Sequence, residues 1–372
     1  MATLTLDKLN LVYPDGTHAV RNVGLIVEDG EFCVFLGPSG CGKTSTLRMV
    51  AGLETPTDGE IRLDGKLINN LYPGERDIAM VFQHYALYPN RTVRDHFEMP
   101  LKAHKVGIAE RNERVAEIAA LLRMEDLLDA KPRQLSGGEA QRTAIGRALI
   151  RKPKLFLLDE PLTSLDATLR LETRTALKRL QEDLGITTIY VTHDQEEALS
   201  LADTIMIMHE GEIQQVADSR QLYAQPANLF VAGFVGMPPM NVIAGELRTA
   251  GDEFFLEASP FDLPIPPDAA GGIDTLGNGT PLVAGIRPED LVLVPAVDRA
   301  LGGTMIVSEM QGDEWIVSLE VVPLSGDDEA LVWKARMKRQ DGEPPDPGQR
   351  VGLAVRAGGL RLFDPEDGSR IS

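Results

Sequence analysis

The segment Gly37-Pro38-Ser39-Gly40-Cys41-Gly42-Lys43-Thr44 determines the architecture of this chain, and it follows the apolar run at residues 32–36. Glycine, four further residues and Gly-Lys-Ser/Thr form the pattern of a phosphate-binding loop between a strand and a helix. The glycines let backbone N–H groups converge on phosphate oxygens, and the lysine brings a positive charge to the terminal phosphates. We therefore expect this loop, with Ser45 after it, to bind a nucleotide, and the Thr44 hydroxyl to ligate Mg²⁺.

A second element places two carboxylates side by side. The apolar run at residues 155–158 ends in Asp159 and Glu160. Two carboxylates at the end of a buried strand are unfavourable unless a cation or water meets them. We expect Asp159 to bind Mg²⁺ and Glu160 to act as the general base that activates the attacking water. Together the two elements predict an enzyme that hydrolyses a nucleoside triphosphate.

Hydrophobic periodicity around these motifs predicts an α/β fold. Continuous apolar runs suit strands that are buried on both faces of a sheet, and they recur at residues 32–36, 155–158, 187–191 and 205–208. Helical spacing of apolar residues lies between these runs, at Val115, Ile118, Ala119 and Leu122, and at Leu177, Leu180 and Leu184. Strands that alternate with helices favour a mainly parallel sheet.

Length and charge bear on domains and partners. A chain of 372 residues exceeds the size at which a single core usually stops growing, so we expect two domains. Its 56 acidic residues against 37 basic residues give a net charge of −19, which argues against nucleic acid as a partner. Residues 241–372 contain 11 basic and 23 acidic residues, in short apolar segments separated by glycine, proline and aspartate. This change of texture predicts a small β-rich domain beyond a boundary near residue 240.

No apolar segment suits a signal peptide or a membrane span. The first ten residues include Asp7 and Lys8, and no apolar run approaches the ~20 residues that a spanning helix needs. The two cysteines, Cys33 and Cys41, are too few for a disulfide framework and are expected to be reduced. We expect the chain to stay in the cytoplasm and to act on a membrane only through partners.

The motif that discriminates among nucleotide hydrolases is Leu135-Ser136-Gly137-Gly138-Glu139-Ala140-Gln141-Arg142. Its residues alone predict a capping box, in which Ser136 caps a helix and Glu139 reaches back. The motif also strongly resembles the signature of ATP-binding cassette (ABC) proteins. The resemblance implies that Ser136, Gly137, Gly138 and Glu139 contact ATP held by the opposite subunit, at a helix N-terminus suited to anions. The family usually has Gln where Glu139 stands, and a carboxylate there would weaken closure unless the capping geometry turns it away.

Four further positions resemble functional positions of the same family. Tyr13 resembles the aromatic residue that stacks on adenine, with a core residue of a hairpin as the alternative. Gln83 resembles the glutamine that senses Mg²⁺ and the channel, and Asp166 resembles part of the loop that reaches the opposite subunit's ATP. His193 follows the run at residues 187–191 after one residue and resembles the catalytic histidine that holds the γ-phosphate. Its place at a strand end is where α/β proteins bind ligands.

The resemblance extends to the architecture of nearly the whole chain. It implies a P-loop NTPase core of the RecA-like type over residues 1–235, with a helical subdomain inserted at about 86–154. The segments at residues 234–241 and 285–290 are similar to the accessory domain of importer ATPases of the carbohydrate-import branch, the maltose and glycerol-phosphate type. We therefore expect residues 236–372 to form an all-β, OB-like (TOBE-type) domain for regulation and dimerisation.

The same resemblance implies an ATPase subunit that powers import of a sugar or related solute through separate transmembrane permease subunits. Two copies of the chain would sandwich two ATP molecules, with Mg²⁺, at the cytoplasmic face of the membrane. An extracytoplasmic solute-binding protein would deliver the solute, and the C-terminal domain would lie against its twin and receive a regulator.

Three alternatives stay open beside sugar import. Related importer motors carry polyamines, inorganic ions or other small solutes. A non-transport ABC ATPase acting on ribosomes or DNA would more typically carry two cassettes or a long coiled-coil insertion, and this chain has neither. A binding module whose acidic C-terminal domain captures a regulatory protein would not need turnover, and the presence of both Glu160 and His193 argues against that reading.

Overall fold

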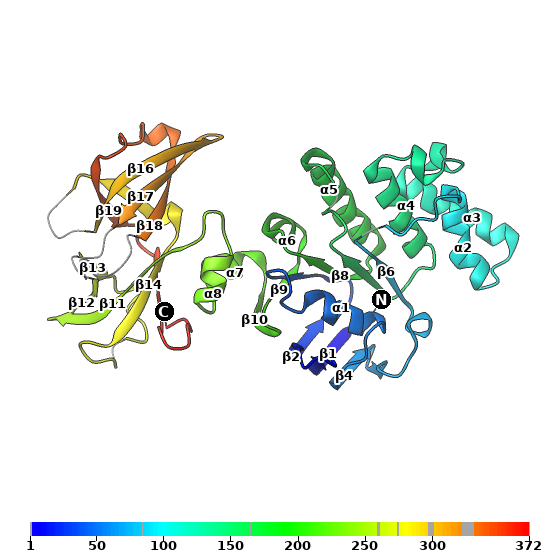
Figure 1. Cartoon of the computed structure of the whole chain (residues 1–372), viewed down its shortest axis with the longest axis horizontal. Coiled ribbons are helices and arrows are strands. Elements are labelled where there is room, and N and C mark those ends of the chain that lie inside the picture. The colour runs from blue at the N-terminus through cyan, green and yellow to red at the C-terminus, as the bar shows by residue number, and fades with distance from the viewer. Residues whose placement is uncertain are drawn as a thin grey trace. The chain divides into compact units, whose positions relative to one another are not determined.

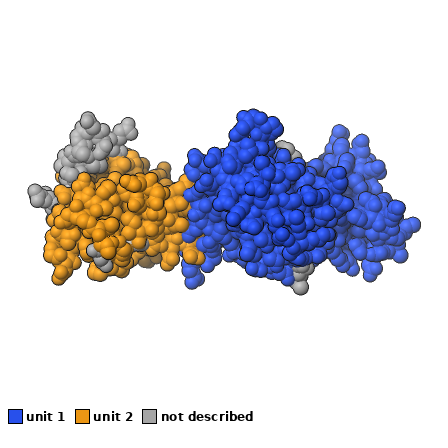
Figure 2. Space-filling view, turned by 90° about the horizontal axis from the view of Figure 1, so that it is seen from below, with its two compact units in different colours: residues 1–220 blue, residues 221–372 orange. Residues whose placement is uncertain are grey.

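The structure is a computed structural model that describes residues 2–83, 85–163, 165–258, 261–273, 275–296, 301–321 and 331–371. These residues form two compact units, residues 1–220 and 221–372, which Figure 2 colours separately. The first unit combines a parallel sheet with helices, and the second is built mainly from antiparallel strands (Figure 1). The fold class predicted from the sequence, an α/β core followed by a β domain, is confirmed.

Six of the described strands form the central sheet of the first unit. Their order from edge to edge is β10 (Glu212–Ala217), β9 (Thr204–His209), β3 (Phe32–Leu36), β8 (Thr187–Thr192), β7 (Leu155–Asp159) and β6 (Ile78–Val81). Neighbours pair in parallel except β10, which is antiparallel to β9. Every residue of β3, β7 and β8 is buried, as expected for strands covered on both faces. The continuous apolar runs therefore mark the centre of the sheet.

A second, antiparallel sheet shares the core of this unit. Its order is β2 (His18–Val27), β1 (Leu4–Val12), β4 (Asp58–Leu63) and β5 (Lys66–Leu67). One apolar core joins it to the central sheet through helix α1 (Lys43–Ala51), and Leu4, Leu47 and Leu157 belong to that core. Buried and exposed side chains mix along β1 and β2, so these strands are not visible as continuous apolar runs. With 10 residues, β2 is also longer than any strand that such runs predict.

The remaining helices of the first unit follow individual strands. Helices α2 (Val93–Ala103), α3 (Ile108–Leu122) and α4 (Gly137–Leu149) come after β6 and are grouped to one side of the sheet, whereas α5 (Ala167–Leu184) and α6 (Gln195–Leu201) come after β7 and β8 (Figure 1). The predicted apolar face of α3 is confirmed, because its buried residues are Val115, Ile118, Ala119 and Leu122. In α5, Leu177 and Leu180 are buried, but Leu184 is 45% exposed because the helix ends beside it, at Gly185. Within the described ranges, every helix is too short or too polar to cross a membrane.

One buried cation fixes the C-terminus of α1, the helix that follows the glycine-rich loop. Arg76 is 3% exposed, and its Nη1 donates hydrogen bonds to the carbonyl oxygens of Met49 at 2.7 Å and Val50 at 2.9 Å. The same guanidinium donates to the carbonyls of Leu71 and Asn69. A positive charge at a helix C-terminus is favourable because the last carbonyls carry partial negative charge. Arg76 thereby ties the segment before β6 to α1 and steadies the helix from which the loop projects.

The second unit opens with two short helices, α7 (Ser219–Ala224), whose first residues still belong to the first unit, and α8 (Leu229–Phe234). Its described strands form two antiparallel sheets. The first has the order β13 (Phe261–Ile265), β12 (Glu253–Ala258), β11 (Asn241–Ala250), β14 (Pro281–Ile286) and β20 (Leu360–Phe363), and the second β15 (Leu291–Val294), β19 (Arg350–Val355), β16 (Gly302–Gln311), β17 (Glu314–Val321) and β18 (Leu331–Lys338). One apolar core, which includes Leu256, Trp333 and Leu362, joins the two sheets.

Arg287 connects the two short helices to the β-sheets of the second unit. Its guanidinium donates hydrogen bonds to the carbonyl oxygens of Ala232, at 3.1 Å, and Val235, and it lies 4.3 Å from the ring centroid of Tyr223. Because of these contacts, α8 and most of α7 pack with the β-rich part of the chain. The boundary between the compact units therefore falls between residues 220 and 221 of the chain, ahead of the boundary at residues 235 and 236 that the sequence predicts.

Candidate functional site

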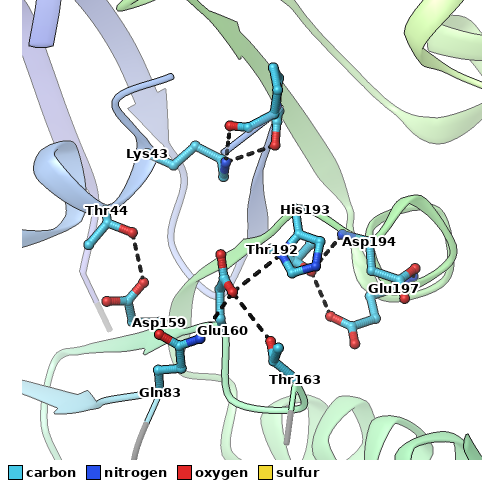
Figure 3. A network of polar contacts seen from close by, with 12 residues as sticks. Lys43, Thr44, Gln83, Asp159, Glu160, Thr163, Thr192, His193, Asp194 and Glu197 are labelled. Carbon is cyan, nitrogen blue, oxygen red and sulfur yellow. Dashed lines mark hydrogen bonds and ion pairs between the residues drawn. The ribbon is translucent and has the colours of Figure 1, made fainter. Parts of the chain in front are cut away.

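The candidate site lies at the carboxyl ends of four neighbouring strands. Strand β3 leads into the loop at residues 37–42, β7 ends at Asp159, β8 is followed by His193, and β6 is followed after one residue by Gln83. Parallel strands end at the same edge of a sheet, so side chains far apart in the sequence meet there (Figure 3). The residues predicted to bind a nucleotide and to catalyse its hydrolysis are thereby brought into one region.

The glycine-rich loop holds its lysine against its own backbone. Lys43 is 4% exposed, and its Nζ donates hydrogen bonds of 2.8 Å to the carbonyl oxygens of Gly37 and Pro38. A side chain at Gly42 would lie 2.4 Å from the carbonyl oxygen of Ala19, and φ at this residue is 107°, so both space and conformation require glycine. The loop therefore presents backbone N–H groups and a fixed positive charge at the start of α1, as a phosphate site needs.

Thr44 and Asp159 form a pair of oxygen ligands beside this loop. The Thr44 Oγ1 donates a 3.1 Å hydrogen bond to Asp159 Oδ1. Asp159 is 7% exposed, and burial raises the pKa of its carboxyl group although the Thr44 hydroxyl opposes that rise. Mg²⁺ is usually held by one or two protein oxygens together with phosphates and water, so this pair fits a magnesium ion that arrives with a nucleotide. Among the described residues no cluster of three or more His, Cys, Asp or Glu side chains suggests a separate metal centre.

The predicted catalytic residues converge on one oxygen of Glu160. Its Oε2 lies 3.3 Å from His193 Nδ1, 3.3 Å from Thr163 Oγ1 and 3.5 Å from Gln83 Nε2 (Figure 3). The Glu160 side chain is 19% exposed, whereas that of His193 is 48% exposed. Gln83, predicted also as a Mg²⁺ ligand, here contacts Glu160 and not the Thr44 and Asp159 pair. A carboxylate with this restrained geometry, open to solvent on one side, is suited to accept a proton from water.

The backbone of Glu160 is held in an unusual conformation. Its φ is 45°, a left-handed value that residues other than glycine seldom adopt. Its N–H donates a 3.0 Å hydrogen bond to the carbonyl oxygen of Val191 in β8. A left-handed backbone conformation persists where the surrounding structure fixes it, and residues in this conformation cluster at functional sites. The conformation turns the side chain of Glu160 away from the buried strand and toward His193.

The signature segment forms the capping box that its sequence predicts. Ser136 precedes α4, its Oγ accepts from the backbone N–H of Glu139 at 3.4 Å, and Glu139 Oε2 accepts from the backbone N–H of Ser136 at 2.7 Å. The hydrogen bonds from Ser136 lower the pKa of Glu139. The carboxylate of Glu139 is therefore engaged by the start of its own helix, beside Ser136.

The start of α4 packs against the start of α5 and not against the loop at residues 37–42. A side chain at Gly138 would lie 2.8 Å from Leu169 Cδ1, and one at Gly137 3.1 Å from Leu165 Cδ2. Asp166 caps α5 through a 3.0 Å hydrogen bond from Leu169 N. Ser136, Gly137 and Asp166 are exposed. Three of the residues predicted to contact a second subunit's ATP are thus exposed near one another, apart from the chain's own phosphate loop, whereas Gly138 is buried.

We predict that Glu139→Gln changes ATP turnover by less than about threefold, because glutamine keeps an oxygen that can accept from Ser136 N and so preserves the capping box. Steady-state phosphate release checks this prediction. Glu139→Ala is the matched variant, because it removes the acceptor of the Ser136 N–H and should cost about 1 kcal/mol of stability. A tenfold or larger gain in Glu139→Gln would show instead that the negative charge restrains the cycle.

Tyr13 lies beside the loop, as its predicted role requires. It follows β1 at the turn into β2, where its N–H donates to the carbonyl oxygen of Thr17, and its hydroxyl lies 3.2 Å from Ser45 Oγ. The side chain is half-buried and also packs against the apolar core of the first unit. The position therefore accommodates both roles considered from the sequence, a stacking surface for a base and a residue of the hairpin core.

Two further residues, which no motif predicts, hold the segment that follows Gln83. Arg147 in α4 donates hydrogen bonds to the carbonyl oxygens of Ala86 at 2.7 Å and Tyr85 at 3.0 Å. His96 in α2 is fully buried, and its Nε2 accepts a 2.8 Å hydrogen bond from Tyr88 N. The other ring nitrogen, Nδ1, lies 2.7 Å from the carbonyl oxygen of Thr92 and donates to it. No sequence pattern points to either residue, because single polar residues in helices have many roles.

The buried histidine predicts a loss of stability in acid. Burial lowers the pKa of His96 below 6.5, and the charges of Arg147 and Arg91 act in the same direction, whereas the Thr92 carbonyl and Asp95 oppose it. A depressed pKa means that the folded state binds this proton more weakly than the unfolded state, so stability present above about pH 6.5 is lost as the pH falls through the folded pKa. His96→Gln should flatten the dependence of Tm on pH between about 6.5 and 5. His104→Gln, at an exposed histidine next to the end of α2, should leave it unchanged, and an unaltered slope in His96→Gln would contradict the assignment.

Comparisons with known proteins match three families in successive parts of the chain. The sequence model of the family described as "ABC transporter" matches residues 20–163, that of the "MalK OB fold domain" matches residues 236–291, and that of the "TOBE domain" matches residues 284–363. The Xylose/arabinose import ATP-binding protein XacK of Haloferax volcanii is 44% identical to this chain. The match spans 100% of this chain and 96% of XacK.

Other relatives have similar names. The Trehalose/maltose import ATP-binding protein MalK of Thermococcus litoralis is 49% identical over 82% of this chain and 84% of its own length. The sn-glycerol-3-phosphate import ATP-binding protein UgpC of Vibrio vulnificus is 42% identical over 98% of this chain and 94% of its own length. A solved structure, the dimeric post-hydrolysis state of the ATP-binding cassette MJ0796 bound to ADP and Pi, matches 58% of this chain and 99% of its own with a TM-score of 0.52 and 34% identity.

Proposed function

The chain belongs to the ABC transporter family of ATP-binding proteins, and we propose that it is the ATPase subunit that powers import of a sugar or related solute through a separate membrane permease. The observation that carries the hydrolytic part is the convergence of His193, Gln83 and Thr163 on one oxygen of Glu160. The named relatives support the import of carbohydrates or glycerol phosphate, since they match nearly the whole chain, including its second unit.

Each residue of the site has a proposed part in hydrolysis. The loop at residues 37–42 and Lys43 bind the triphosphate, Ser45 completes the start of the helix, and Tyr13 stacks on the base. Thr44 and Asp159 would hold Mg²⁺, which when bound neutralises charge on the terminal phosphates. Glu160 accepts the proton of the attacking water, and His193 donates a hydrogen bond toward the γ-phosphate while keeping its contact with Glu160.

Gln83 is proposed to connect this site with the permease. Its amide contacts Glu160, and the segment after it is held by Arg147 and His96 from α4 and α2. A movement of these helices would therefore displace the segment that carries Gln83, and a change at Glu160 would be transmitted to the same segment. This linkage supports coupling between ATP hydrolysis and a membrane partner.

A second copy of the chain is proposed to complete each ATP site. Ser136, Gly137 and Asp166 form an exposed surface at the starts of α4 and α5, apart from the chain's own loop, so they are available to ATP bound by a partner. Gly138 lies behind them against Leu169. The dimeric structure of the similar cassette MJ0796 supports a two-chain arrangement. We place this dimer at the cytoplasmic face of the membrane, with an extracytoplasmic binding protein delivering the solute and with the second unit open to a regulator.

The cargo is tested by uptake in the source cells. Deleting the gene should abolish uptake of one labelled sugar or glycerol phosphate, and the parent chain should restore that uptake whereas Glu160→Gln should not. Purification of the tagged chain from detergent-solubilised membranes should recover permease subunits. Loss of polyamine or ion uptake with sugar uptake intact would select the alternative cargo, and recovery with ribosomes and without membrane subunits would point to a non-transport ATPase.

A further inference from the structure

A buried carboxylate lies behind the predicted catalytic histidine. Glu197, in the first turn of α6, is only 4% exposed, whereas its neighbour Glu196 is exposed. Figure 3 places Glu197 on the far side of Thr192 from the Glu160 carboxylate. Burying a carboxylate is costly unless hydrogen bonds satisfy it, so its presence here calls for a physical reason.

Two hydroxyl groups of β8 satisfy this carboxylate. Glu197 Oε2 accepts hydrogen bonds from Thr192 Oγ1 at 2.7 Å and from Tyr190 Oη at 2.8 Å. Tyr190 and Thr192 are themselves buried. Burial raises the pKa of Glu197, and the two hydroxyl groups counteract part of that rise. The carboxyl end of β8 is thereby attached through side chains to α6.

The contacts continue into the backbone on both sides of His193. Thr192 Oγ1, which donates to Glu197, accepts a 3.0 Å hydrogen bond from the N–H of Asp194. Asp194 in turn caps α6, with its Oδ1 accepting from the N–H groups of Glu196 at 2.8 Å and Glu197 at 3.2 Å. The bend of chain that carries His193 is therefore fixed at its two ends, by Thr192 and by Asp194.

We infer that Glu197 is a positioning residue for ATP hydrolysis: by holding the Thr192 hydroxyl it fixes the bend that presents His193 Nδ1 to Glu160 Oε2. This inference rests on the proposed function, in which His193 and Glu160 act together on the γ-phosphate and the attacking water. The 3.3 Å separation of these two atoms depends on backbone placement, because the His193 side chain is 48% exposed and has little packing to hold it. Misplacement by about 1 Å is enough to cost about 10²-fold in rate.

The test compares turnover in variants of the full chain. Glu197→Ala should lower kcat for ATP hydrolysis by about 10- to 100-fold while changing KM for ATP by less than about threefold. Glu197→Gln keeps an oxygen that accepts from both hydroxyls and should retain kcat within about threefold of the parent. Thr192→Val, which removes the connecting hydroxyl, should reproduce the loss. Glu196→Ala, at the exposed neighbour, is the matched control and should behave like the parent.

A double variant separates positioning from a general effect on folding. If Glu197 acts through His193, adding Glu197→Ala to His193→Ala should lower kcat no further than His193→Ala alone. Multiplicative losses in the double variant, or parental kcat in both Glu197→Ala and Thr192→Val, would overturn the inference. Should Glu197→Ala fail to fold, Thr192→Val decides the question. Absence of ATP hydrolysis in the parent, or full activity of His193→Ala, would instead reject the proposed function.

Discussion

Glu160→Gln is expected to leave ATP binding intact and to cut hydrolysis by at least about 10²-fold. The substitution keeps the size and shape of the side chain, so its neighbours His193 and Thr163, both at 3.3 Å, retain a hydrogen-bonding partner. An amide, however, does not accept a proton from water at neutral pH. Steady-state phosphate release measures the loss, and equilibrium titration with ATP measures the binding.

The matched control is Glu182→Gln, which makes the same chemical change at an exposed position of α5 and should retain parental turnover. If Glu160→Gln hydrolysed ATP at a rate near that of the parent, the assignment of Glu160 as general base would be wrong. Weak ATP binding in this variant would show instead that the carboxylate helps to hold the nucleotide.

Lys43→Met is expected to weaken ATP binding by about 10²-fold. The lysine supplies a positive charge to the terminal phosphates, and a hydrogen bond involving a charged group contributes about 1.5–3 kcal/mol. In the present structure its Nζ donates to the carbonyl oxygens of Gly37 and Pro38, so the charge is already located within the loop. Equilibrium titration with ATP measures the affinity.

The control for this substitution is Lys66→Met, at an exposed lysine of β5, and it should bind ATP as the parent does. The Tm of Lys43→Met must also be recorded, because the substitution removes the donor to two loop carbonyls. Parental affinity for ATP in a folded Lys43→Met chain would contradict the assignment of residues 37–44 as the nucleotide site.

The fold could be predicted where the sequence carries a clear hydrophobic pattern. Strands β3, β7, β8 and β9 are buried on both faces, so their apolar residues run continuously and their existence follows from the sequence. Strands β1 and β2 mix buried and exposed residues, and continuous apolar runs do not reveal them. Leu184 matched the helical period, but the helix ended beside it and left it exposed. Whether a side chain near the end of a helix is buried depends on tertiary packing, which the spacing of apolar residues does not predict.

The site could be predicted as a set of residues but not as a set of contacts. The motifs name Lys43, Glu160 and His193, and strand-end placement implies that they share an edge of the sheet. Gln83 and His193 approach the same oxygen of Glu160 because the backbone at Glu160 is left-handed. No sequence pattern predicts that conformation. Glu197 was missed for a related reason, since a glutamate near a helix start is most often exposed, and only the neighbouring hydroxyls distinguish this one.

The proposed dimer follows from where the signature residues of the first unit lie. Ser136 and Asp166 belong to an exposed surface of the first unit, and the second unit has a core of its own. If the second unit alone held two copies together, the chain would be dimeric with or without ATP, and the nucleotide would act on an existing pair. If ATP is the main link, association should require it.

The molar mass of Glu160→Gln, measured by light scattering with and without ATP in the absence of Mg²⁺, decides whether ATP links two chains. Hydrolysis is blocked in this variant, so bound ATP persists during the measurement. The shared-site account predicts the mass of one chain without nucleotide and of two chains at saturating ATP. The mass of a single chain at saturating ATP, with ATP demonstrably bound, would contradict it.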